Sequence, residues 1–402
     1  MNFLEKLLDG VAVEWKNLGE VAKIYDGTHQ TPKYTSSGVP FVSVQNIRNL
    51  YTTKKFISVD DFEKYKYKPQ KDDLFMTRIG DIGTCAVVEN DEPLAYYVTL
   101  TLIRVDKNSI LSKFLKYVIE SHIGKSELYK RTLVHAAPIK INLGEIGKII
   151  IPIPPLEIQA EIVRILDTFT ELTAELTAEL TDRQKQYNYY RDRLLTVEKG
   201  EAEWKTLGDV CHYVDYRGKT PTKTLEGIFL VTAKNIRPGY IDYEASQEFI
   251  SEDDYASVMR RGLPRLGDVL ITTEAPCGFV AQVDRENIAL AQRVIKYRSK
   301  NKRLSNSFLK HYLLGGHFQN KLLKTATGST VKGIKGSKLH QLTIPIPSEA
   351  EQARIVAILD KFDTLTTSIR EGLPREIALR QKQYEYYRDL LLTFPKSEEI
   401  EA

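Results

Sequence analysis

RQKQYNYYRDRLLT, residues 183–196, is repeated almost unchanged as RQKQYEYYRDLLLT, residues 380–393. Twelve of the fourteen positions agree, and only Asn188/Glu385 and Arg193/Leu390 differ. Shared composition does not produce agreement of this kind. The stretch therefore indicates an internal duplication, which has to be recognised before any other pattern is interpreted.

The duplication extends upstream of both copies. IPIP precedes each helical run, at residues 151–154 and 344–347. Farther upstream, EWKNLGEV at 14–21 corresponds to EWKTLGDV at 203–210. The chain is thus two copies of one module, a globular segment followed by a helical segment. We expect an N-terminal segment at 1–13, globular domains at 14–150 and 200–343, and helical segments at 151–199 and 344–402.

Composition excludes several broad classes of protein. Charged residues make up 27% of the 402 positions, yet the net charge is only +4. The three cysteines, Cys85, Cys211 and Cys277, lie far apart and indicate neither a disulfide framework nor a zinc site. No apolar run reaches membrane-spanning length, and the start MNFLEKLLDG lacks an apolar signal core. We expect a soluble protein of the bacterial cytoplasm, with residues 2–10 forming a short amphipathic helix.

The sequence predicts an α+β fold for both globular segments. Short β-branched or aromatic runs, separated by Gly, Pro and Asn, predict strands first, and helical spacing follows from Ser112 and from Phe308. The predicted strands begin at Pro40, Asp73, Cys85 and Tyr96 in the first segment and at Gly227, Gly267 and Ala289 in the second.

The helical segments carry the heptad spacing of a coiled-coil seam, broken by a stutter at the ELTA repeats of residues 171–181. Residues 156–197 would form a rod of about 63 Å, which must bury its seam. We expect the two helical segments to pack antiparallel as a pseudo-twofold pair, with one globular segment at each end. Gly372 and Pro374 predict a break in the second helix within 370–376.

Sequence marks of catalysis are missing. Residues 328–333 have the spacing of a Walker loop, but Ile334 and Lys335 follow in place of Lys-Ser/Thr. The only Pro-Pro pair precedes Leu156, so the N/D/S-P-P-Y tetrapeptide of adenine methylation is absent, as are G-x-G-x-x-G at a helix start and His-x-x-x-His. We find no catalytic or metal constellation and expect a non-catalytic protein.

Basic residues gather in segments that resemble loops. KYKYKPQK at 64–71 interleaves tyrosine with lysine, a second cluster occupies 130–140, and KTATGSTVKGIKGSK at 324–338 combines Lys with Gly, Ser and Thr and contains no acid. Lysine neutralises phosphates, and glycine lets backbone amides approach them, so these segments suit a nucleic-acid surface. Solvated strand edges and loops are the alternative.

Two divergent α+β segments alternate with two nearly identical helical segments, with IPIP before each helix and RQKQYxYYRD inside it. This arrangement resembles the specificity subunit of type I restriction-modification enzymes, and the ELTA repeats with GLPREIALRQKQYEYYRD at 372–389 resemble its IC branch. The resemblance implies that each globular segment is a target recognition domain reading one half of a bipartite, asymmetric DNA site. It implies that the helices set the spacing and dock two methyltransferase subunits, joined by two restriction/translocase subunits. S-adenosylmethionine, ATP and Mg would then belong to the partners, with no cofactor in this chain.

Residues shared between the copies cannot tell two half-sites apart, so we expect them to be structural or to position phosphates; they are Thr31, Pro32, Asn46, Arg48, Thr220, Pro221, Asn235 and Arg237. Candidate DNA-binding residues are taken where the copies disagree. In the first domain they are His29, Gln30, Lys33, Arg78, Arg131, His135 and Lys140. In the second they are Arg217, Lys219, Lys223, Glu274, Lys324, Thr327, Ser329, Lys332 and Lys335.

The repeated helical stretch supplies the candidate docking surface. Tyr187 and Tyr384 fall on the seam, which favours core packing, while the neighbouring basic residues are expected to face outward. The candidates for methyltransferase docking are Arg183, Lys185, Arg191, Arg380, Lys382 and Arg388, with a solvated helix face as the alternative. A competing function is a non-catalytic coiled-coil adaptor that binds proteins rather than DNA. A stand-alone nuclease or methyltransferase would need a metal site or cofactor loop that the sequence does not show.

Overall fold

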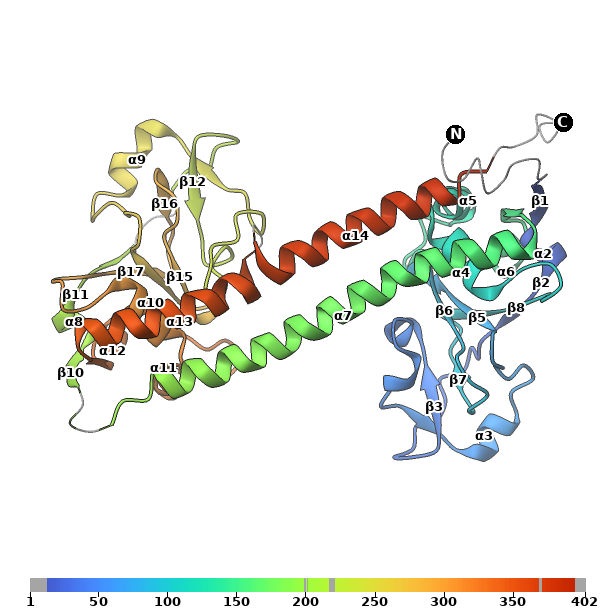
Figure 1. The fold of residues 1–402 in the computed structure, drawn as a ribbon, viewed down its shortest axis with the longest axis horizontal. Coiled ribbons are helices and arrows are strands. Elements are labelled where there is room, and N and C mark those ends of the chain that lie inside the picture. The colour runs from blue at the N-terminus through green and yellow to red at the C-terminus, as the bar shows by residue number, and fades with distance from the viewer. Residues whose placement is uncertain (1–12, 199, 201, 217–220, 369–370, 395–402) are drawn as a thin grey trace. The chain divides into compact units, whose positions relative to one another are not determined.

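The computed structural model describes residues 13–394 except 199, 201, 217–220 and 369–370. The chain divides into two compact units (Figure 1). Unit 1 comprises residues 1–174 and 379–402, and unit 2 comprises residues 175–378. The amphipathic helix expected at residues 2–10 lies outside the described residues.

Unit 1 contains a four-stranded antiparallel sheet in the order β2-β8-β5-β6, a three-stranded sheet β4-β3-β7 and a two-stranded sheet β1-β9. In chain order its strands are β1 (Glu14–Asn17), β2 (Ala22–Asp26), β3 (Val39–Val42), β4 (Phe56–Ile57), β5 (Leu74–Ile79), β6 (Asp81–Val87), β7 (Ala95–Tyr96), β8 (Leu100–Val105) and β9 (Ile150–Ile153). Its helices are α2 (Leu18–Val21), η1 (Val44–Asn46), η2 (Leu50–Thr52), α3 (Val59–Glu63), α4 (Ser112–Glu120), α5 (His122–Arg131) and α6 (Leu143–Ile146). The start of α7 (Leu156–Leu194) and the end of α14 (Gly372–Leu391) complete the unit.

Unit 2 repeats this plan with sheets β11-β17-β14-β15, β13-β12-β16 and β10-β18. Its strands are β10 (Glu203–Thr206), β11 (Cys211–Asp215), β12 (Ile228–Val231), β13 (Phe249–Ile250), β14 (Val269–Thr273), β15 (Cys277–Gln282), β16 (Ile288–Leu290), β17 (Val294–Ser299) and β18 (Thr343–Ile346). Its helices are α8 (Leu207–Val210), α9 (Glu252–Val258), α10 (Asn306–Leu314), α11 (Gly316–Thr325), α12 (Gly336–Leu339) and α13 (Glu349–Thr367), with the remaining parts of α7 and α14. The α+β class and the duplication are confirmed.

In both units the four-stranded sheet packs against the first helix that follows it. Figure 1 shows this sheet beside α4 in unit 1 and beside α10 in unit 2, with the three-stranded sheets farther from the long helices. Leu74 and Met76 of β5 lie in one buried cluster with Phe114 and Leu115 of α4. Burying a large apolar side chain contributes about 1.5–3 kcal/mol, so this contact forms the centre of each core.

The shared EWK and IPIP motifs pair with each other, which the sequence analysis did not predict. Trp15 lies opposite Pro152 in the β1–β9 ladder, and Trp204 lies opposite Pro345 in the β10–β18 ladder. Proline lacks a backbone donor, so it is tolerated in such short edge pairings. Each motif therefore depends on the other, and together they join the start of each globular segment to its end.

The helical seam is confirmed in both units. In unit 1 the first part of α7 packs against the last part of α14, and the rings of Phe169 and Tyr387 stack at 5.4 Å. In unit 2 the last part of α7 packs against α13, and the rings of Tyr187 and Phe362 stack at 6.1 Å. The beginning of one helical segment thus meets the end of the other, as expected for an antiparallel pair.

The predicted break in the second helical segment is also confirmed. Helix α13 ends at Thr367, and α14 begins at Gly372, whose φ of +79° is disfavoured for residues with a side chain. A Cβ atom at this position would lie 2.4 Å from the backbone oxygen of Thr364. Gly372 rather than Pro374 dictates the break, because proline is tolerated in a first helical turn.

Candidate nucleic-acid interface

Arg78, a predicted base-reading residue, is instead part of the core of unit 1. Only 8% of its side chain is exposed, and its Nη2 donates to both carboxylate oxygens of Asp26 at 3.0 and 3.1 Å. Its Nε donates to the backbone oxygen of Val98, and its Nη1 donates to that of Ile141. With these donors engaged inside the protein, Arg78 does not face a ligand, and we withdraw it as a reader.

The segment after β2 presents three other candidates. His29, Gln30 and Lys33 are exposed, and His29 Nε2 lies 2.8 Å from Asp26 Oδ2. The Gln30 backbone amide donates to the hydroxyl of Thr28 at 3.3 Å, which bends the chain locally. Asp26 thus holds Arg78 on its buried side and His29 on its exposed side, so the exposed segment is anchored to the core.

A loop at residues 131–140 lies against the end of strand β5, in the same region of the four-stranded sheet. The Leu133 amide donates to the Lys140 backbone oxygen at 2.8 Å, and Ile141 donates to Arg78 at 3.0 Å. His135 and Lys140 are exposed within this loop, whereas Arg131 is ion-paired to Glu127 at 2.8 Å with 17% of its side chain exposed. The loop therefore offers His135 and Lys140 to a ligand, while Arg131, the last residue of α5, pairs with Glu127 one turn earlier in the same helix.

The corresponding loop of unit 2, residues 324–335, is built in the same way. Thr327 and Gly333 exchange backbone hydrogen bonds at 2.8 and 2.9 Å, and Ile334 donates to Thr273 at 2.9 Å. Gly328 has a φ of +109°, which glycine adopts without strain. All five candidate side chains are exposed; they are Lys324, Thr327, Ser329, Lys332 and Lys335. The loop therefore brings several cations and hydroxyl groups to the surface.

The remaining second-domain candidates differ in position. Lys223 is paired with Glu248 at 2.8 Å, and its hydrogen bond keeps the pKa of that carboxyl below its usual range. Glu274 lies in the pocket described below. Arg217 and Lys219 lie outside the described residues.

Residues shared by the two copies are structural where their contacts are known. The side-chain oxygen of the fully buried Asn235 accepts from the Thr232 amide at 3.0 Å, and its amide donates to the backbone oxygens of Asp242 and Ser246. Asn46 likewise accepts from the Ser43 amide at 3.2 Å. These contacts confirm the structural part of the expectation for both asparagines.

The lysine- and tyrosine-rich segment at 64–71 packs largely on its own domain. The ring of Tyr67 stacks on that of Tyr25 at 4.0 Å, so it is engaged within the unit. Lys64 pairs with Asp61 at 2.7 Å, and Lys68 pairs with Glu63. The solvated-surface reading fits this segment better than a nucleic-acid surface.

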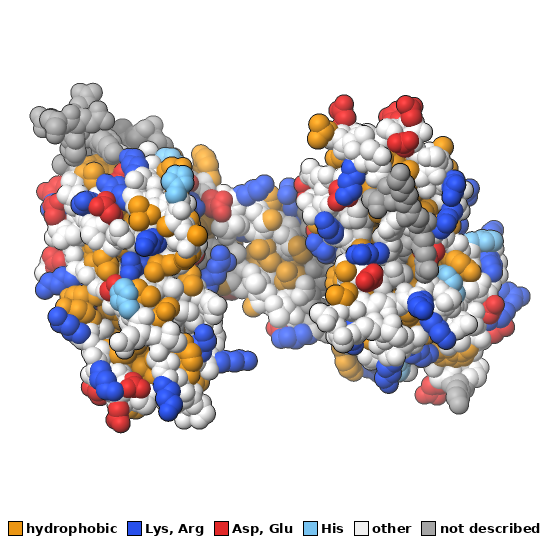
Figure 2. Space-filling view, turned by 180° about the vertical axis from the view of Figure 1, so that it is seen from behind, with side chains coloured by type: hydrophobic (Ala, Val, Ile, Leu, Met, Phe, Trp, Pro, Cys, Tyr) orange, Lys and Arg blue, Asp and Glu red, His pale blue; other side chains and the backbone are white. Residues whose placement is uncertain are grey.

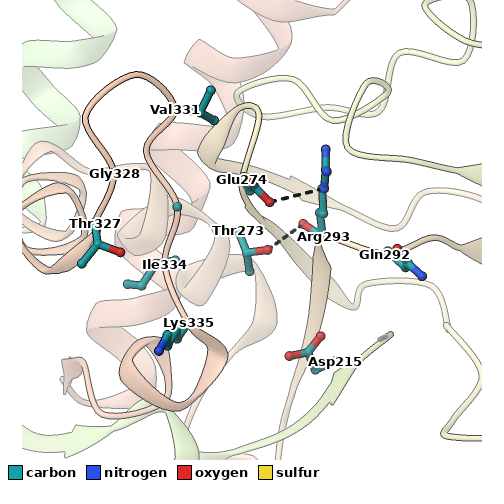
Figure 3. A pocket seen from close by; sticks show the side chains of 11 residues that line it. Asp215, Thr273, Glu274, Gln292, Arg293, Thr327, Gly328, Val331, Ile334 and Lys335 are labelled. Atoms are coloured by element: carbon teal, nitrogen blue, oxygen red, sulfur yellow. Dashed lines mark hydrogen bonds and ion pairs between the residues drawn. The ribbon is translucent and has the colours of Figure 1, made fainter. Parts of the chain in front are cut away.

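Unit 2 holds a pocket of about 470 Å³ between the ends of its strands and the 324–335 loop. Figure 3 shows Thr273 and Asp215 on one side of it and Thr327, Ile334 and Lys335 on the other. Its lining residues are Asp215, Thr273, Glu274, Gln292, Arg293, Thr327, Gly328, Val331, Gly333, Ile334 and Lys335. The Nε of Arg293 lies 3.4 Å from a carboxylate oxygen of Glu274. Lys335 therefore belongs both to the pocket lining and to the basic 324–335 loop.

Asp215, Thr273, Gln292 and Arg293 were not among the residues predicted from the sequence. A signal was available, because the offset that relates the two EWK motifs also places Asp26 on Asp215. Both copies have an aspartate at the end of this strand, although the neighbouring residues differ. The aspartate therefore marks a position at which the sequences of the two copies can be aligned.

The docking candidates fall into two groups. Arg183, Lys185, Arg380 and Lys382 are at least partly exposed on their helices. Arg191 and Arg388 were expected to face outward, and the structure contradicts this: 14% and 8% of their side chains are exposed, and each guanidinium lies over the ring of the seam tyrosine four residues earlier. Cation–π contact with Tyr187 and Tyr384 accounts for the inward orientation.

Tyrosines occupy exposed positions on the same helical stretches. Tyr189 and Tyr386 are 60% and 65% exposed, and each forms an edge-to-face pair with the next tyrosine. Exposed aromatic residues of this kind are enriched where proteins meet. The helical repeat therefore presents tyrosine together with Lys185 and Lys382.

Other kinds of site are not evident in the part of the chain that the structure describes. Three or more potential metal ligands do not come together there, and none of its helices has the length and apolar character needed to span a bilayer. Figure 2 shows basic side chains spread over the visible face of each unit and mixed with acidic ones. Any DNA-binding surface on this face would consist of local loops rather than one broad basic patch.

Comparison with known proteins identifies the family. Residues 11–183 and 200–379 match the type I restriction modification DNA specificity domain. The chain is 38% identical over 429 residues to the EcoR124I/EcoR124II specificity subunit of Escherichia coli, covering 100% of this chain and 99% of that one. It is 32% identical to a putative type I specificity subunit of Haemophilus influenzae, covering 98% of each.

A solved structure shows the same fold. The type I restriction-modification S subunit from M. genitalium superimposes with a TM-score of 0.55 at 14% identity, over 98% of this chain and 100% of that one. A chain from a structure describing assembly of a type I R-M system gives a TM-score of 0.59 at 18% identity, over 94% and 97%. Family match, sequence identity and fold agree, and the chain belongs to the type I restriction-modification specificity subunits.

Proposed function

We propose that this chain is the non-catalytic DNA-reading subunit of a type I restriction-modification complex. The globular domain of each unit reads one half of a bipartite, asymmetric DNA site. The two helical segments set the distance between the halves and dock two methyltransferase subunits, and two restriction/translocase subunits complete the assembly. S-adenosylmethionine, ATP and Mg are bound by those partners.

One observation carries the proposal: the 131–140 and 324–335 loops occupy the same place in the two copies but differ in sequence. Both loops hydrogen-bond to the end of the equivalent strand, through Ile141 to Arg78 and through Ile334 to Thr273. Both also present exposed basic groups, including Lys140 and Lys335. A common scaffold with different exposed loops is what two unlike half-sites require, since base edges are read by side chains.

The helical segments support the spacing and docking roles. Helix α7 begins in unit 1, ends in unit 2 and runs without interruption for 39 residues, or about 58 Å. Its exposed Tyr189 and the equivalent Tyr386 lie in the most strongly repeated stretch of the sequence. A surface that occurs twice suits two identical partners.

Methylation-site mapping of the reconstituted complex tests the proposal. The unsubstituted chain should yield one bipartite site. A variant lacking residues 175–178, one ELTA unit, shortens the helix by about 6 Å, between one and two base-pair steps of about 3.4 Å. We expect fewer unspecified bases between unchanged half-sites, whereas altered half-sites with unchanged spacing would refute the spacing role.

A protein-binding adaptor predicts a different result. It would give no DNA binding whose strength falls as salt rises, whereas phosphate contacts make such a fall unavoidable. Binding of the reconstituted complex to duplex DNA at several salt concentrations separates the two functions.

A further inference from the structure

The two loops that lie against the ends of β5 and β14 share one backbone pairing. The Leu133 amide donates to the Lys140 backbone oxygen, and the Thr327 amide donates to the Gly333 backbone oxygen, both at 2.8 Å. Each pair is an antiparallel bridge that closes a short turn. The residues enclosed by each bridge therefore form the tip of the loop, and the tips of the two copies can be compared directly.

The tips differ in chemical character. In unit 1 the tip, residues 133–139, carries Leu133, Val134 and Ile139 with 45%, 43% and 37% exposure, and we call it the apolar tip. The tip in unit 2, residues 327–332, has glycine, hydroxyl side chains and a lysine around a single valine, and we call it the polar tip. One scaffold thus presents apolar groups in unit 1 and hydrogen-bonding groups in unit 2.

Backbone hydrogen bonds fix the apolar tip to the end of β5. The Gly80 amide donates to the Ile139 backbone oxygen at 2.8 Å, and the Ile141 amide donates to that of Arg78 at 3.0 Å. The Arg78 guanidinium donates in return to the backbone oxygen of the fully buried Ile141 at 3.1 Å. The apolar side chains are therefore held in place before any ligand arrives, which lowers the entropy lost on binding.

The surroundings of the apolar tip favour a phosphate-bearing ligand. Residues 128–140 contain no acid, and His135 and Lys140 are exposed beside the apolar side chains. Glu127, which precedes this segment, is buried and ion-paired with two basic residues of its own helix. The carboxylate of Asp81, beyond the β5 end, accepts from the Thr77 hydroxyl at 3.2 Å. Apolar groups bordered by cations suit DNA, where phosphates flank the base edges.

We propose that the apolar tip reads the C5-methyl group of a thymine in the first half-site. This inference rests on the proposed function. The thymine methyl is the apolar group that base pairs present in the major groove, and side chains recognise it by apolar contact. Val134 and Ile139 make this contact, and Lys140 neutralises an adjoining phosphate.

The second half-site is read by other means. The hydroxyl of Ser329 and the ammonium of Lys332 are exposed on the polar tip and donate hydrogen bonds to base edges or phosphates. The two domains therefore differ in the kind of contact that they make as well as in the bases that they read.

Deoxyuridine tests the contact, because it lacks the thymine methyl group and keeps the same hydrogen-bonding edge. Each thymine of the first half-site, on either strand, is replaced in turn, and binding is measured with the full chain assembled with its methyltransferase subunits. One replacement should weaken binding about three- to fivefold, as expected for the loss of one buried methyl group. A first half-site in which no replacement has this effect, or which contains no thymine, overturns the proposal.

Serine substitutions locate the contact on the protein. The double variant Val134→Ser/Ile139→Ser removes the apolar groups from exposed positions and should bind thymine and deoxyuridine DNA equally. Val331→Ser is the matched control, because it makes the same change in the polar tip, where Val331 is 52% exposed. The control should keep the three- to fivefold preference for thymine in the first half-site.

The outcomes separate the two proposals. If the unsubstituted complex methylates no bipartite site, the proposed function fails and the thymine contact fails with it. If a bipartite site is found but the double variant still prefers thymine, the contact alone is overturned. An equal loss of preference in Val331→Ser would also overturn it. If the double variant binds methyltransferase subunits more weakly and keeps the preference, the apolar tip contacts protein instead. If that variant does not fold, the deoxyuridine series on the unsubstituted complex decides.

Discussion

Units 1 and 2 hold the same backbone plan with different chemistry at equivalent positions. Both keep an arginine–aspartate pair on the central strands, with Nη2 of Arg104 2.6 Å from Asp73 and Nε of Arg298 2.5 Å from Asp268. In unit 1 a second such pair joins Arg78 to Asp26, and in unit 2 Thr273 takes the place of Arg78, since the amides of Ile141 and Ile334 donate to the backbone oxygens of these two residues. The two units share backbone hydrogen bonds at the ends of these strands but differ in the side chains there, so this region can give the two domains different functions.

The largest effect should come from breaking the pair between Arg78 and Asp26 in unit 1. Arg78→Ala leaves the Asp26 carboxylate without its buried cation, a change that costs about 3–5 kcal/mol at fully buried pairs. Asp26 is one-quarter exposed, so we expect about 3 kcal/mol for unit 1. Thr273→Ala, at the equivalent position, should cost about 0.5–1 kcal/mol, since it removes one exposed hydrogen bond.

Hydrogen exchange read separately on peptides of β5 and β14 measures both changes against the unsubstituted chain. Equal losses of protection in the two variants would mean that the Arg78 pair contributes no more than a surface hydrogen bond. The residues at positions 78 and 273 would then contribute equally to the stability of their units.

The comparison also shows what sequence alone can establish. The helical seam follows from apolar spacing because a long helix must bury one face, and the break at Gly372 follows from backbone sterics. Burial of Arg78 could not be foreseen, since its partner Asp26 is 52 residues away and the pairing depends on strand register. The outward orientation predicted for Arg388 was wrong for a similar reason, because helical spacing does not show where a long side chain turns. A cation one turn from a seam tyrosine can fold back over the tyrosine ring.

A second, smaller effect tests the difference between the continuous α7 and the interrupted α13–α14 segment. Gly372→Ala forces a side chain onto a φ of +79° and against the Thr364 oxygen, and we expect a loss of about 2 kcal/mol from unit 2. The reverse change in α7, Ala178→Gly at an exposed position, should cost about 1 kcal/mol through helix propensity alone.

Urea denaturation of the two variants compares these costs. If Gly372→Ala is neutral or stabilising, the break does not depend on glycine. The continuous and interrupted segments would then differ for another reason, with Pro374 as the next residue to replace.

The smallest effect concerns the contact between each domain and its long helices. In unit 1 the Tyr117 hydroxyl donates to Asp167 at 2.5 Å, and in unit 2 His311 takes the same position, with Nε2 2.7 Å from Asp360 and Nδ1 3.4 Å from the Tyr187 hydroxyl. Neutral His311 with its proton on Nε2 satisfies both contacts, and Lys310 lies beside it, paired with Asp363. Burial lowers the pKa of His311 below 6.5, despite the opposing effect of Asp360.

A lowered pKa means that below pH 6.5 the unfolded chain binds a proton that the folded unit does not. The free energy of unfolding of unit 2 should therefore fall as pH drops below about 6.5, until the folded pKa is reached. His311→Tyr, which copies Tyr117 of unit 1, should remove this part of the pH dependence because tyrosine stays neutral throughout that range. Denaturation of both proteins between pH 7 and pH 5 isolates the His311 contribution, since the other histidines are common to them. If the two pH profiles are parallel, protonation of His311 is not coupled to folding, and the exchange of Tyr for His between the copies has no consequence for how the helices are held.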